Sequence, residues 1–337
     1  MPVNSEFCSL HNHTTFSLMD SLIKPQDLFS RAKELNYPAV GITDHGSLGA
    51  AWDALKASKS SGVKLIMGCE FNFVNSVSDQ VEQRLRHIIL LARNHIGYKN
   101  LLHLSKKGYE NHILAFKRAI PRIDWQMLSD YSEGVICLTA CGNGILGQLI
   151  NNKKSEQAKE QAKKLKDIFG QYLGFEIQPH NLRRQPTPYN DYEDQTFVNR
   201  TLIKWGQELD VKVVPTCNAH YLFLEHHEAH DALLAIGASQ PVRSGQRLKY
   251  EPEMYLKSRQ QIVDFFSRYY KEKAEEFCDN TIEFASWCEF PDWIDPKFSN
   301  PSGKELPDFP VEKQPDYEEF LAGYENLYAE WKDVLES

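Results

Sequence analysis

The feature that most constrains the fold is a regular alternation of short apolar runs with amphipathic, helix-forming stretches. Seven runs are rich in Val, Ile and Leu, are bounded by Gly, Pro or polar residues, and predict strands. They cover residues 7–10, 39–43, 65–69, 87–92, 135–139, 173–177 and 212–216. Repetition of strand and helix predicts parallel strands with helices outside them. An open doubly wound sheet and a closed α/β barrel both fit this pattern.

The alternation stops past residue 225, where helical patterns follow one another without strands between them. A Pro-rich stretch over 291–315 then predicts an extended connector, and residues 317–335 predict a last helix. We therefore expect an α/β domain, a helical extension, and a connector with a terminal helix. The expected boundaries of these parts are 1–225, 226–290 and 291–337.

Charge and cysteine content narrow the class of protein. The formal net charge is −8, so contact with DNA must be local or must depend on bound cations. Seven cysteines, without a CxxC pair, argue against a disulfide framework and indicate a reducing compartment. The chain shows no secretory signal peptide and no apolar run of about 18 residues. We expect a cytoplasmic location and no membrane partner.

Side chains that can bind metal recur where the predicted strands end. They are His11, His13, Asp20, Asp44, His45, Glu70, Cys141, Glu176, His180, Asn218 and His220. Active sites of α/β barrels are built at the carboxyl-terminal rim, so this placement favours the barrel. His87 is the exception, because it opens its predicted strand.

The residue types in this set predict a metal centre. His11 and His13 lie on one face of an extended segment, because strand side chains alternate between faces. Imidazoles, carboxylates and the Cys141 thiolate together suit Zn²⁺, Mn²⁺ or Fe, and they are too many for one tetrahedral ion. We expect two or three divalent ions. Taken singly, each residue has a plainer reading, such as a turn at Asp44 and His45. Recurrence at several strand ends favours the metal.

Two arginines and one histidine are predicted to contact the substrate, and the other histidines are left out of the site. Arg183 and Arg184, together with His180, are predicted to contact the phosphate groups of a substrate. Histidines without a strand-end position are left out of the site. They are His95, His103, His112, His226, His227 and His230, of which the last three are expected at helix starts and on the surface.

Several segments resemble one family in order and spacing. They read LHNHTTFSLMDSL, GITDHG, MGCEF, HIILLARNHIGYKN, CLTACGNGILGQLI, FEIQPH and MYLKSRQQIVDFF. This series is similar to the polymerase-and-histidinol-phosphatase (PHP) superfamily, and within it to the N-terminal PHP domain of bacterial DNA polymerase III alpha subunits. The resemblance runs from about residue 5 to past residue 290.

The resemblance implies an α/β fold, a distorted (β/α)7 TIM-like barrel with a helical C-terminal extension. It also implies a trinuclear metal cluster. The corresponding ligands are His11, His13, Asp20, His45, Glu70, His87, Cys141, Asn218 and His220. Asn218 departs from the family pattern, which carries Asp there. An amide brings no negative charge and bridges poorly, so we expect one metal position to be weakened.

The chemistry expected of such a site is metal-assisted hydrolysis of phosphodiesters, with the 3′ end of a DNA primer as substrate. This reading makes the chain a 3′→5′ proofreading exonuclease domain. Its expected partners are the rest of a polymerase III alpha-type protein or other replisome subunits. The residues expected to act in catalysis are His11, His13, Glu70, His87, Cys141 and His220. The resemblance ends before the polymerase palm carboxylates, so the chain is not expected to polymerise DNA alone.

Two alternatives stay open. One is a catalytically weakened PHP scaffold that binds polymerase or exonuclease partners, which Asn218 favours. The other is a stand-alone phosphatase of the histidinol-phosphate type. The segments after residue 95 argue against the second, because simple PHP phosphatases are not expected to carry them.

Overall fold

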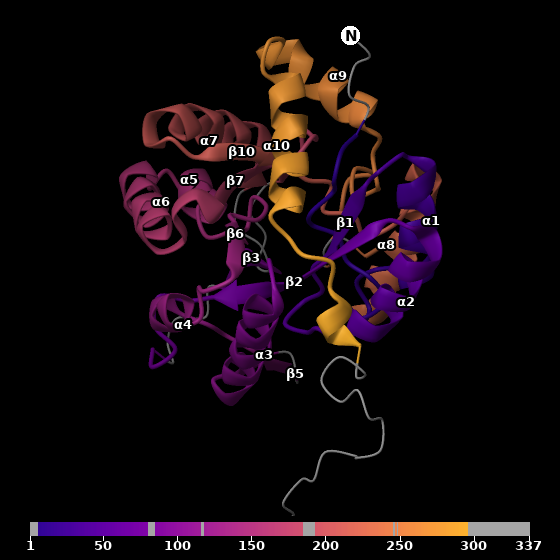
Figure 1. Ribbon diagram of the computed structural model, residues 1–337, viewed down its shortest axis with the longest axis horizontal. Coiled ribbons are helices and arrows are strands. Elements are labelled where there is room, and N and C mark those ends of the chain that lie inside the picture. The colour runs from indigo at the N-terminus through magenta and orange to yellow at the C-terminus, as the bar shows by residue number, and fades with distance from the viewer. Residues whose placement is uncertain are drawn as a thin grey trace, which may run out of the picture. The chain divides into compact units, whose positions relative to one another are not determined.

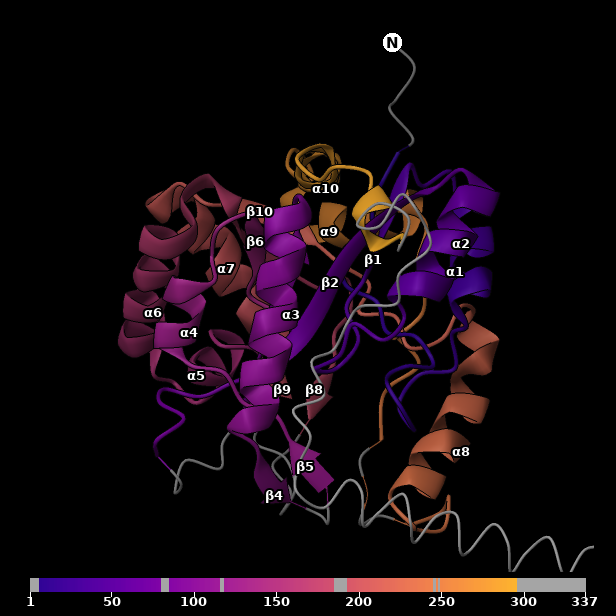
Figure 2. The ribbon, with the colours of Figure 1, turned by 60° about the horizontal axis from the view of Figure 1, so that its bottom comes forward.

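The structure is a computed structural model, and its core is a curled sheet surrounded by helices (Figures 1 and 2). The residues that it describes are 6–79, 85–115, 118–184, 193–244, 247 and 249–295. The sheet has six strands in the order β1-β2-β3-β6-β7-β10. They are β1 (Ala39–Ile42), β2 (Lys64–Phe73), β3 (Arg86–Ala92), β6 (Val135–Leu138), β7 (Leu173–Ile177) and β10 (Lys212–Pro215).

Strand direction differs from the prediction at one place. The pairs β1/β2, β6/β7 and β7/β10 are parallel, whereas β3 runs antiparallel to both β2 and β6. The expectation of an entirely parallel sheet is therefore wrong for β3. A parallel neighbour needs a crossover connection, usually a helix, and the described part of the β2–β3 connection contains none.

Residues 7–13 occupy the place of a seventh strand between β1 and the end of β10. Gly41 N donates to Ser9 O at 2.8 Å, Thr43 N to Asn12 O at 2.9 Å, and His13 N to Ala219 O at 2.9 Å. A Cβ on Gly41 would lie 2.4 Å from Leu10 O, so only glycine allows this approach.

The prediction of a regular strand over 7–10 is nevertheless wrong, because side chains replace part of its ladder. Cys8 N donates to Thr281 Oγ1 at 3.0 Å, and Cys217 N donates to Ser9 Oγ at 3.4 Å. The curled sheet with this segment at its seventh position confirms the predicted distorted barrel.

Helices cover the outside of the sheet (Figures 1 and 2). Those between strands are α1 (Pro25–Glu34), α2 (Ala51–Ser61), α3 (His95–Glu110), α4 (Trp125–Asp130), α5 (Gly147–Asn151), α6 (Ser155–Phe169) and α7 (Gln195–Leu209). Two small hairpins add β4 (Ile113–Ala115) with β5 (Arg118–Ile120), and β8 (Arg183–Arg184) with β9 (Glu193–Asp194). None of the described helices is long and apolar enough to cross a membrane.

The C-terminal helices pack on the barrel. They are α8 (His227–Gly237), α9 (Arg259–Tyr270) and α10 (Ala274–Ser286). Asn280 Nδ2 of α10 donates to Val213 O of β10 at 2.9 Å, and residues up to Asp295 form one compact unit. The boundaries expected at 225 and 290 stay predictions. The expected connector begins with η3 (Asp292–Ile294), and its remainder and the predicted last helix lie outside the described residues.

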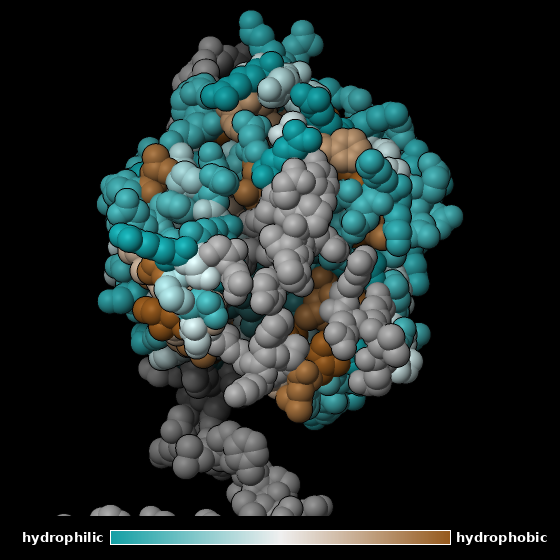
Figure 3. Space-filling model, turned by 180° about the vertical axis from the view of Figure 1, so that it is seen from behind, coloured by the Kyte–Doolittle hydropathy of each residue, from teal (hydrophilic) through white to brown (hydrophobic). Residues whose placement is uncertain are grey.

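The inner face of the barrel changes from apolar to polar along its length. Ile66, Ile89 and Leu138 belong to a buried cluster that Phe284 of α10 completes. Strand side chains alternate between faces, so Glu70 of β2 shares the inner face with Ile66. The apolar cluster therefore fills the barrel below a polar end. The part of the outer surface that Figure 3 colours is mostly hydrophilic, with apolar side chains in separate groups.

Candidate metal centre

The first segment and its loop bring three predicted ligands to the polar end of the barrel. His11 and His13 lie on residues 7–13, and Asp20 returns through a tight loop in which Asp20 N donates to Ser17 O at 3.1 Å. Met19, just before Asp20, has a φ of 61°. Such a left-handed backbone is costly for a residue with a side chain, and it persists where surrounding contacts fix it.

The other ligands come from strand ends around the rim. His45 follows β1, and Glu70 lies on β2. His87 is near the start of β3 and still reaches the same rim, because β3 is antiparallel to its neighbours. Cys141 follows β6, and its Sγ lies 3.7 Å from His87 Nδ1. His220 follows β10.

Glu70 is the centre of the arrangement. Its Oε2 lies 2.7 Å from His11 Nε2 and 3.3 Å from His13 Nε2. Its Oε1 lies 2.7 Å from His87 Nδ1 and 3.3 Å from His45 Nδ1. One buried carboxylate therefore faces four imidazoles. We call His11, His13 and Glu70 the inner group, since their ligand atoms all lie within 4.8 Å of one another.

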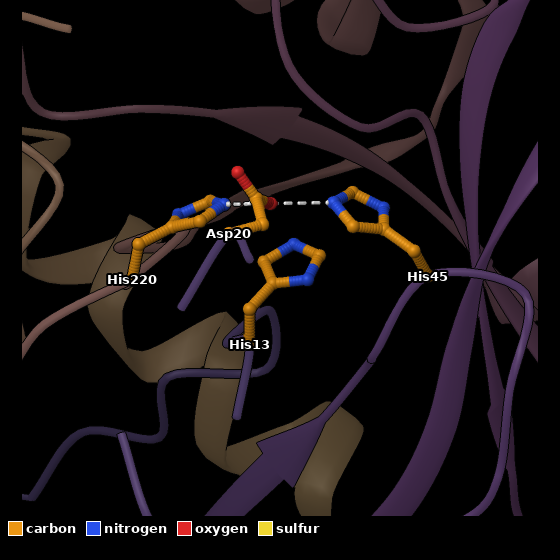
Figure 4. A group of neighbouring side chains, drawn as sticks. All are labelled: His13, Asp20, His45 and His220. Carbon is orange, nitrogen blue, oxygen red and sulfur yellow. Dashed lines mark hydrogen bonds and ion pairs between the residues drawn. The ribbon is translucent and has the colours of Figure 1, made fainter. Parts of the chain in front are cut away.

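Asp20 is the centre of a second set, which we call the outer group. Its Oδ2 lies 2.8 Å from His45 Nε2 and 3.1 Å from His220 Nε2, with His13 beneath the three (Figure 4). The ligand atoms of His13, Asp20, His45 and His220 again lie within 4.8 Å of one another. His13 thus lies between the two groups, and its one free lone pair, on Nε2, can bind the ion of one of them.

The protonation of three histidines tests whether the residues fit a metal. An acceptor faces each Nδ1: Glu176 Oε1 at 2.7 Å from His11, Ser17 Oγ at 3.0 Å from His13, and Asn218 O at 2.9 Å from His220. With the proton on Nδ1, each Nε2 turns a lone pair toward a carboxylate oxygen. Such atoms repel unless a proton or a cation lies between them, and a hydrogen-bonded Nδ1 is the usual arrangement in a metal-binding histidine.

Two further contacts agree with that test. His11 Nε2 and His13 Nε2 lie only 3.1 Å apart, where a shared positive partner is needed. Asn218 Oδ1 is buried and has no hydrogen-bond partner among the described residues, which leaves an oxygen donor for an ion. Asn218, with a φ of 45°, and Ala140, which precedes Cys141 and has a φ of 61°, also have left-handed backbones, which persist where surrounding contacts fix them. The side chains present therefore fit divalent metal ions.

The electrostatics of the centre support the same reading. Burial opposes ionisation of Glu70, but His87 and His45 hold the pKa of its carboxyl well below its usual range. Burial lowers the pKa of His13 well below its usual range, and His45 and His220 lower it further. Burial also acts against protonation of His11, yet Glu176 and Glu70 raise its pKa to about 9. An ion at His11 must displace that proton, so metal binding releases protons.

The structure brings every predicted ligand to this one site. A single pocket is lined by His13, His45, Glu70, His87, Cys141, Asn218 and His220, and His11 and Asp20 adjoin it through the contacts above. Their roles as ligands stay a prediction.

The predicted substrate contacts are placed differently. His180 is 1% exposed, and both of its ring nitrogens are engaged, by Gln178 Oε1 at 3.0 Å and by Leu182 N at 3.3 Å. This geometry does not support contact with a substrate. Arg183 is 68% exposed, with its Nε 3.5 Å from Asp194 Oδ2. The side chain of Arg184 lies outside the described residues.

The expectation that His230 is a surface histidine is wrong. It is fully buried, and its Nε2 lies 2.7 Å from the backbone oxygen of Asp20. Helical periodicity could have shown this, because His230 and the buried Leu234 are four residues apart on α8. Sequence reasoning also missed Gln178 and Tyr250, which line the pocket and have no metal-binding chemistry to mark them.

Comparisons with known proteins confirm the resemblance. The PHP domain model matches residues 9–180. The DNA polymerase III subunit alpha of Borreliella burgdorferi is 34% identical over 317 residues, with 92% of this chain and 26% of that protein covered. The same subunit of Aquifex aeolicus is also 34% identical, with 75% and 22% covered. The chain thus spans about a quarter of the length of these curated relatives.

Solved structures are more distant. An amidohydrolase from Chromobacterium violaceum has 13% identity and a TM-score of 0.42, with 63% of this chain and 87% of that chain covered. A two-domain protein from Bacteroides vulgatus, which contains a predicted PHP-like metal-dependent phosphoesterase, has 13% identity and a TM-score of 0.35, with 64% and 52% covered. At these TM-scores neither likeness adds to the description of the site.

Proposed function

The chain belongs to the PHP domain family, and from this premise we propose that it is a metal-dependent phosphodiesterase that shortens DNA from a primer 3′ end. We place it within a polymerase III alpha-type protein, because its curated relatives carry that name. The observation that carries the proposal is the pair of metal-binding groups that share His13. Sites with two or more ions favour in-line displacement at phosphorus, because they can neutralise both the attacking and the leaving oxygen.

Each group has a distinct place for an ion. His11, His13 and Glu70 would hold the inner ion, with His87 and Cys141 at the other oxygen of Glu70. Asp20, His45 and His220 would hold the outer ion beside His13, whose one free lone pair, on Nε2, would bind the inner ion, and Asn218 Oδ1 offers the outer ion a neutral oxygen. Bound divalent ions, with Zn²⁺ and Mn²⁺ as first candidates, would supply a water of lowered pKa and positive charge for the phosphate oxygens.

The chain's own residues hold this charge in place. Glu70 and Asp20 balance the cations, while Glu176 and Ser17 keep the protons of His11 and His13 on Nδ1. Ser17 Oγ donates in turn to the buried Asp44 at 2.7 Å, which fixes the direction of the His13 contact. Because the protein is acidic overall, with a net charge of −8, the cations are what would draw an anionic DNA end to this rim.

Metal content and primer cleavage test the proposal together. Protein purified without chelator is measured by elemental mass spectrometry and then incubated with a 3′-labelled and a 5′-labelled primer. We expect two or more ions per chain, and primer shortening that EDTA abolishes and added Zn²⁺ or Mn²⁺ restores. For variants that replace a site histidine by Asn, the matched control is His112→Asn, at an exposed histidine outside the site. Absence of bound metal and of cleavage would refute the proposal, and phosphate release from monoesters alone would favour a phosphatase.

One observation favours a second function. Asn218 replaces the acidic residue of the family pattern, and an amide lowers the negative charge available to the outer ion. A chain that binds metal at the inner group without shortening primers would therefore be a PHP scaffold for polymerase or exonuclease partners.

A further inference from the structure

A buried chain of polar side chains leads away from His11 toward the loop after β7. It begins at Glu176, which is fully buried and accepts three hydrogen bonds on Oε1. The donors are His11 Nδ1 at 2.7 Å, Thr216 Oγ1 at 2.5 Å and Gln178 Nε2 at 3.1 Å. The other oxygen, Oε2, has no hydrogen-bond partner among the described residues. The contacts of Glu176 therefore all converge on the oxygen that faces His11.

The direction of every bond in this chain follows from its far end. Leu182 N lies 3.3 Å from His180 Nδ1, and a backbone N–H can only donate, so Nδ1 carries no proton. The ring proton then lies on Nε2, which donates to Gln178 Oε1 at 3.0 Å. With its oxygen engaged, Gln178 must present its NH₂ group to Glu176. No reversal is possible without turning a donor toward a donor or an acceptor toward an acceptor.

Asn199 holds the backbone of Gln178 in place. Gln178 N donates to Asn199 Oδ1 at 3.0 Å, and Asn199 Nδ2 donates back to Gln178 O at 2.7 Å. Both residues are buried. If the Gln178 amide turned over, its oxygen would face Glu176 Oε1, and two acceptors would repel each other at hydrogen-bond distance.

We infer that Gln178 and His180 are positioning residues that act through Glu176 to hold His11 with its proton on Nδ1 and with Nε2 directed at the inner metal position. This inference rests on the proposed function, because it assigns a role toward a bound metal. It gives His180 a part in metal binding in place of the predicted contact with substrate. The series of hydrogen bonds also connects the inner group to the loop that continues into Arg183, since its first donor is Leu182 N.

Gln195 provides a matched control for a buried glutamine. It is fully buried on α7, and its Nε2 donates to Asn199 Oδ1 at 2.9 Å, whereas its Oε1 has no hydrogen-bond partner among the described residues. Gln178 and Gln195 therefore share chemistry, burial and a neighbour. They differ in that Gln178 contacts Glu176.

The test measures zinc affinity by competition with a chromophoric chelator, on the full chain stripped of metal. We expect Gln178→Met to weaken zinc binding by about 10–100-fold, the usual effect of losing a residue behind a metal ligand. Gln195→Met should change the affinity by less than about 3-fold. His180→Phe should act in the same direction as Gln178→Met but less strongly, because Gln178 keeps its direct hydrogen bond to Glu176.

Equal zinc affinity of wild type and Gln178→Met would overturn the inference, and so would equal losses in the Gln178 and Gln195 variants. A wild-type chain that binds neither Zn²⁺ nor Mn²⁺ would overturn both this inference and the proposed function, whereas the first two results leave the proposed function standing. If Gln178→Met does not fold, ¹⁵N–¹H spectra of the imidazoles in zinc-loaded wild type and His180→Phe decide. His11 protonated at Nδ1 in wild type, with that signal weakened in the variant, supports the inference. A signal that is unchanged in the variant contradicts it.

Discussion

The inner and outer groups differ in how the protein encloses them. In the inner group, His11 and His13 are fully buried and Glu70 is 2% exposed. In the outer group, Asp20 is 20% and His45 38% exposed, whereas His220 is 3% exposed. The histidines of the inner group are backed by buried side chains, Glu176 and Ser17, whereas His220 of the outer group is backed by a backbone oxygen. An inner ion would thus be held tightly, and an outer ion would face solvent and substrate.

The fold explains this difference. His11 and Glu70 lie on segments of the barrel wall whose backbones pair with neighbouring segments on both sides. Asp20 lies in the loop over 14–20 and His220 in the connection after β10. Sites on rigid elements hold their geometry more closely than sites on loops. The site therefore changes from an enclosed interior to a more exposed mouth, an arrangement that suits the proposed binding and release of a DNA end.

The largest expected effect comes from His13, because it would bind the inner ion through Nε2 and also lies against the outer group. We expect His13→Asn to lose the inner ion, to weaken the outer one, and to lower primer cleavage by more than about 100-fold, beyond the effect of losing a supporting residue. His45→Asn should lose the outer ion alone, since His45 belongs to that group. Elemental mass spectrometry of the two variants checks this. Equal metal loss in both would show that the two groups are one site.

Asn218→Asp should strengthen the outer group. A carboxylate in place of the buried amide adds a charged ligand, so we expect outer-ion affinity to rise by about tenfold while inner-ion affinity stays unchanged. Without metal the same change buries another anion near Asp20 and Glu70, and should lower the free energy of unfolding by about 1–3 kcal/mol. Thermal unfolding of the variant and the wild type, with and without Zn²⁺, measures the expected gain of stability with the ion and the expected loss without it. Destabilisation in both conditions would show that position 218 does not contact the ion.

The residues that gather at the site are easier to predict from the sequence than the geometry that gathers them. Residue types at strand ends single out His45, Glu70 and Cys141, because hydrophobic runs locate strands without any knowledge of their pairing. For the same reason His87 is the exception among them, because it opens its predicted strand. Its position depends on the antiparallel direction of β3, which is set by tertiary pairing and leaves no mark in local periodicity.

Residues that support ligands were hardest to predict. Gln178 has no metal-binding chemistry, and its role depends on hydrogen bonds to Glu176 and His180 whose direction only three-dimensional contacts define. The composition of residues 7–10 predicts a regular strand, yet side-chain oxygens replace some of the backbone hydrogen bonds that such a strand would make. Both features arise from contacts between residues far apart in sequence, which a pattern along the chain does not contain.

A smaller effect is expected at His230, which touches the outer group through the backbone of Asp20. His230→Phe keeps an aromatic ring in the buried position but removes this hydrogen bond, worth about 0.5–1.5 kcal/mol. Outer-ion affinity should therefore fall by about 2–10-fold, with inner-ion affinity unchanged. His226→Phe, at a half-buried histidine of the preceding turn, is the control. Equal losses at both ions would mean that His230 supports the fold and not the loop of Asp20.

The smallest effect is expected at Arg183, which lies outside both groups. Its side chain is 68% exposed, so Arg183→Ala should leave metal content unchanged and raise the KM for primers by about 2–3-fold through loss of one phosphate contact. The slope of log affinity against log salt should fall by about 0.7, the value for one contact to a single strand. Lys204→Ala, at an equally exposed cation on α7, should change neither quantity. An unchanged salt slope in Arg183→Ala would mean that Arg183 makes no contact with a phosphate group. The bound ions of the inner and outer groups would then have to provide the recognition of the primer end.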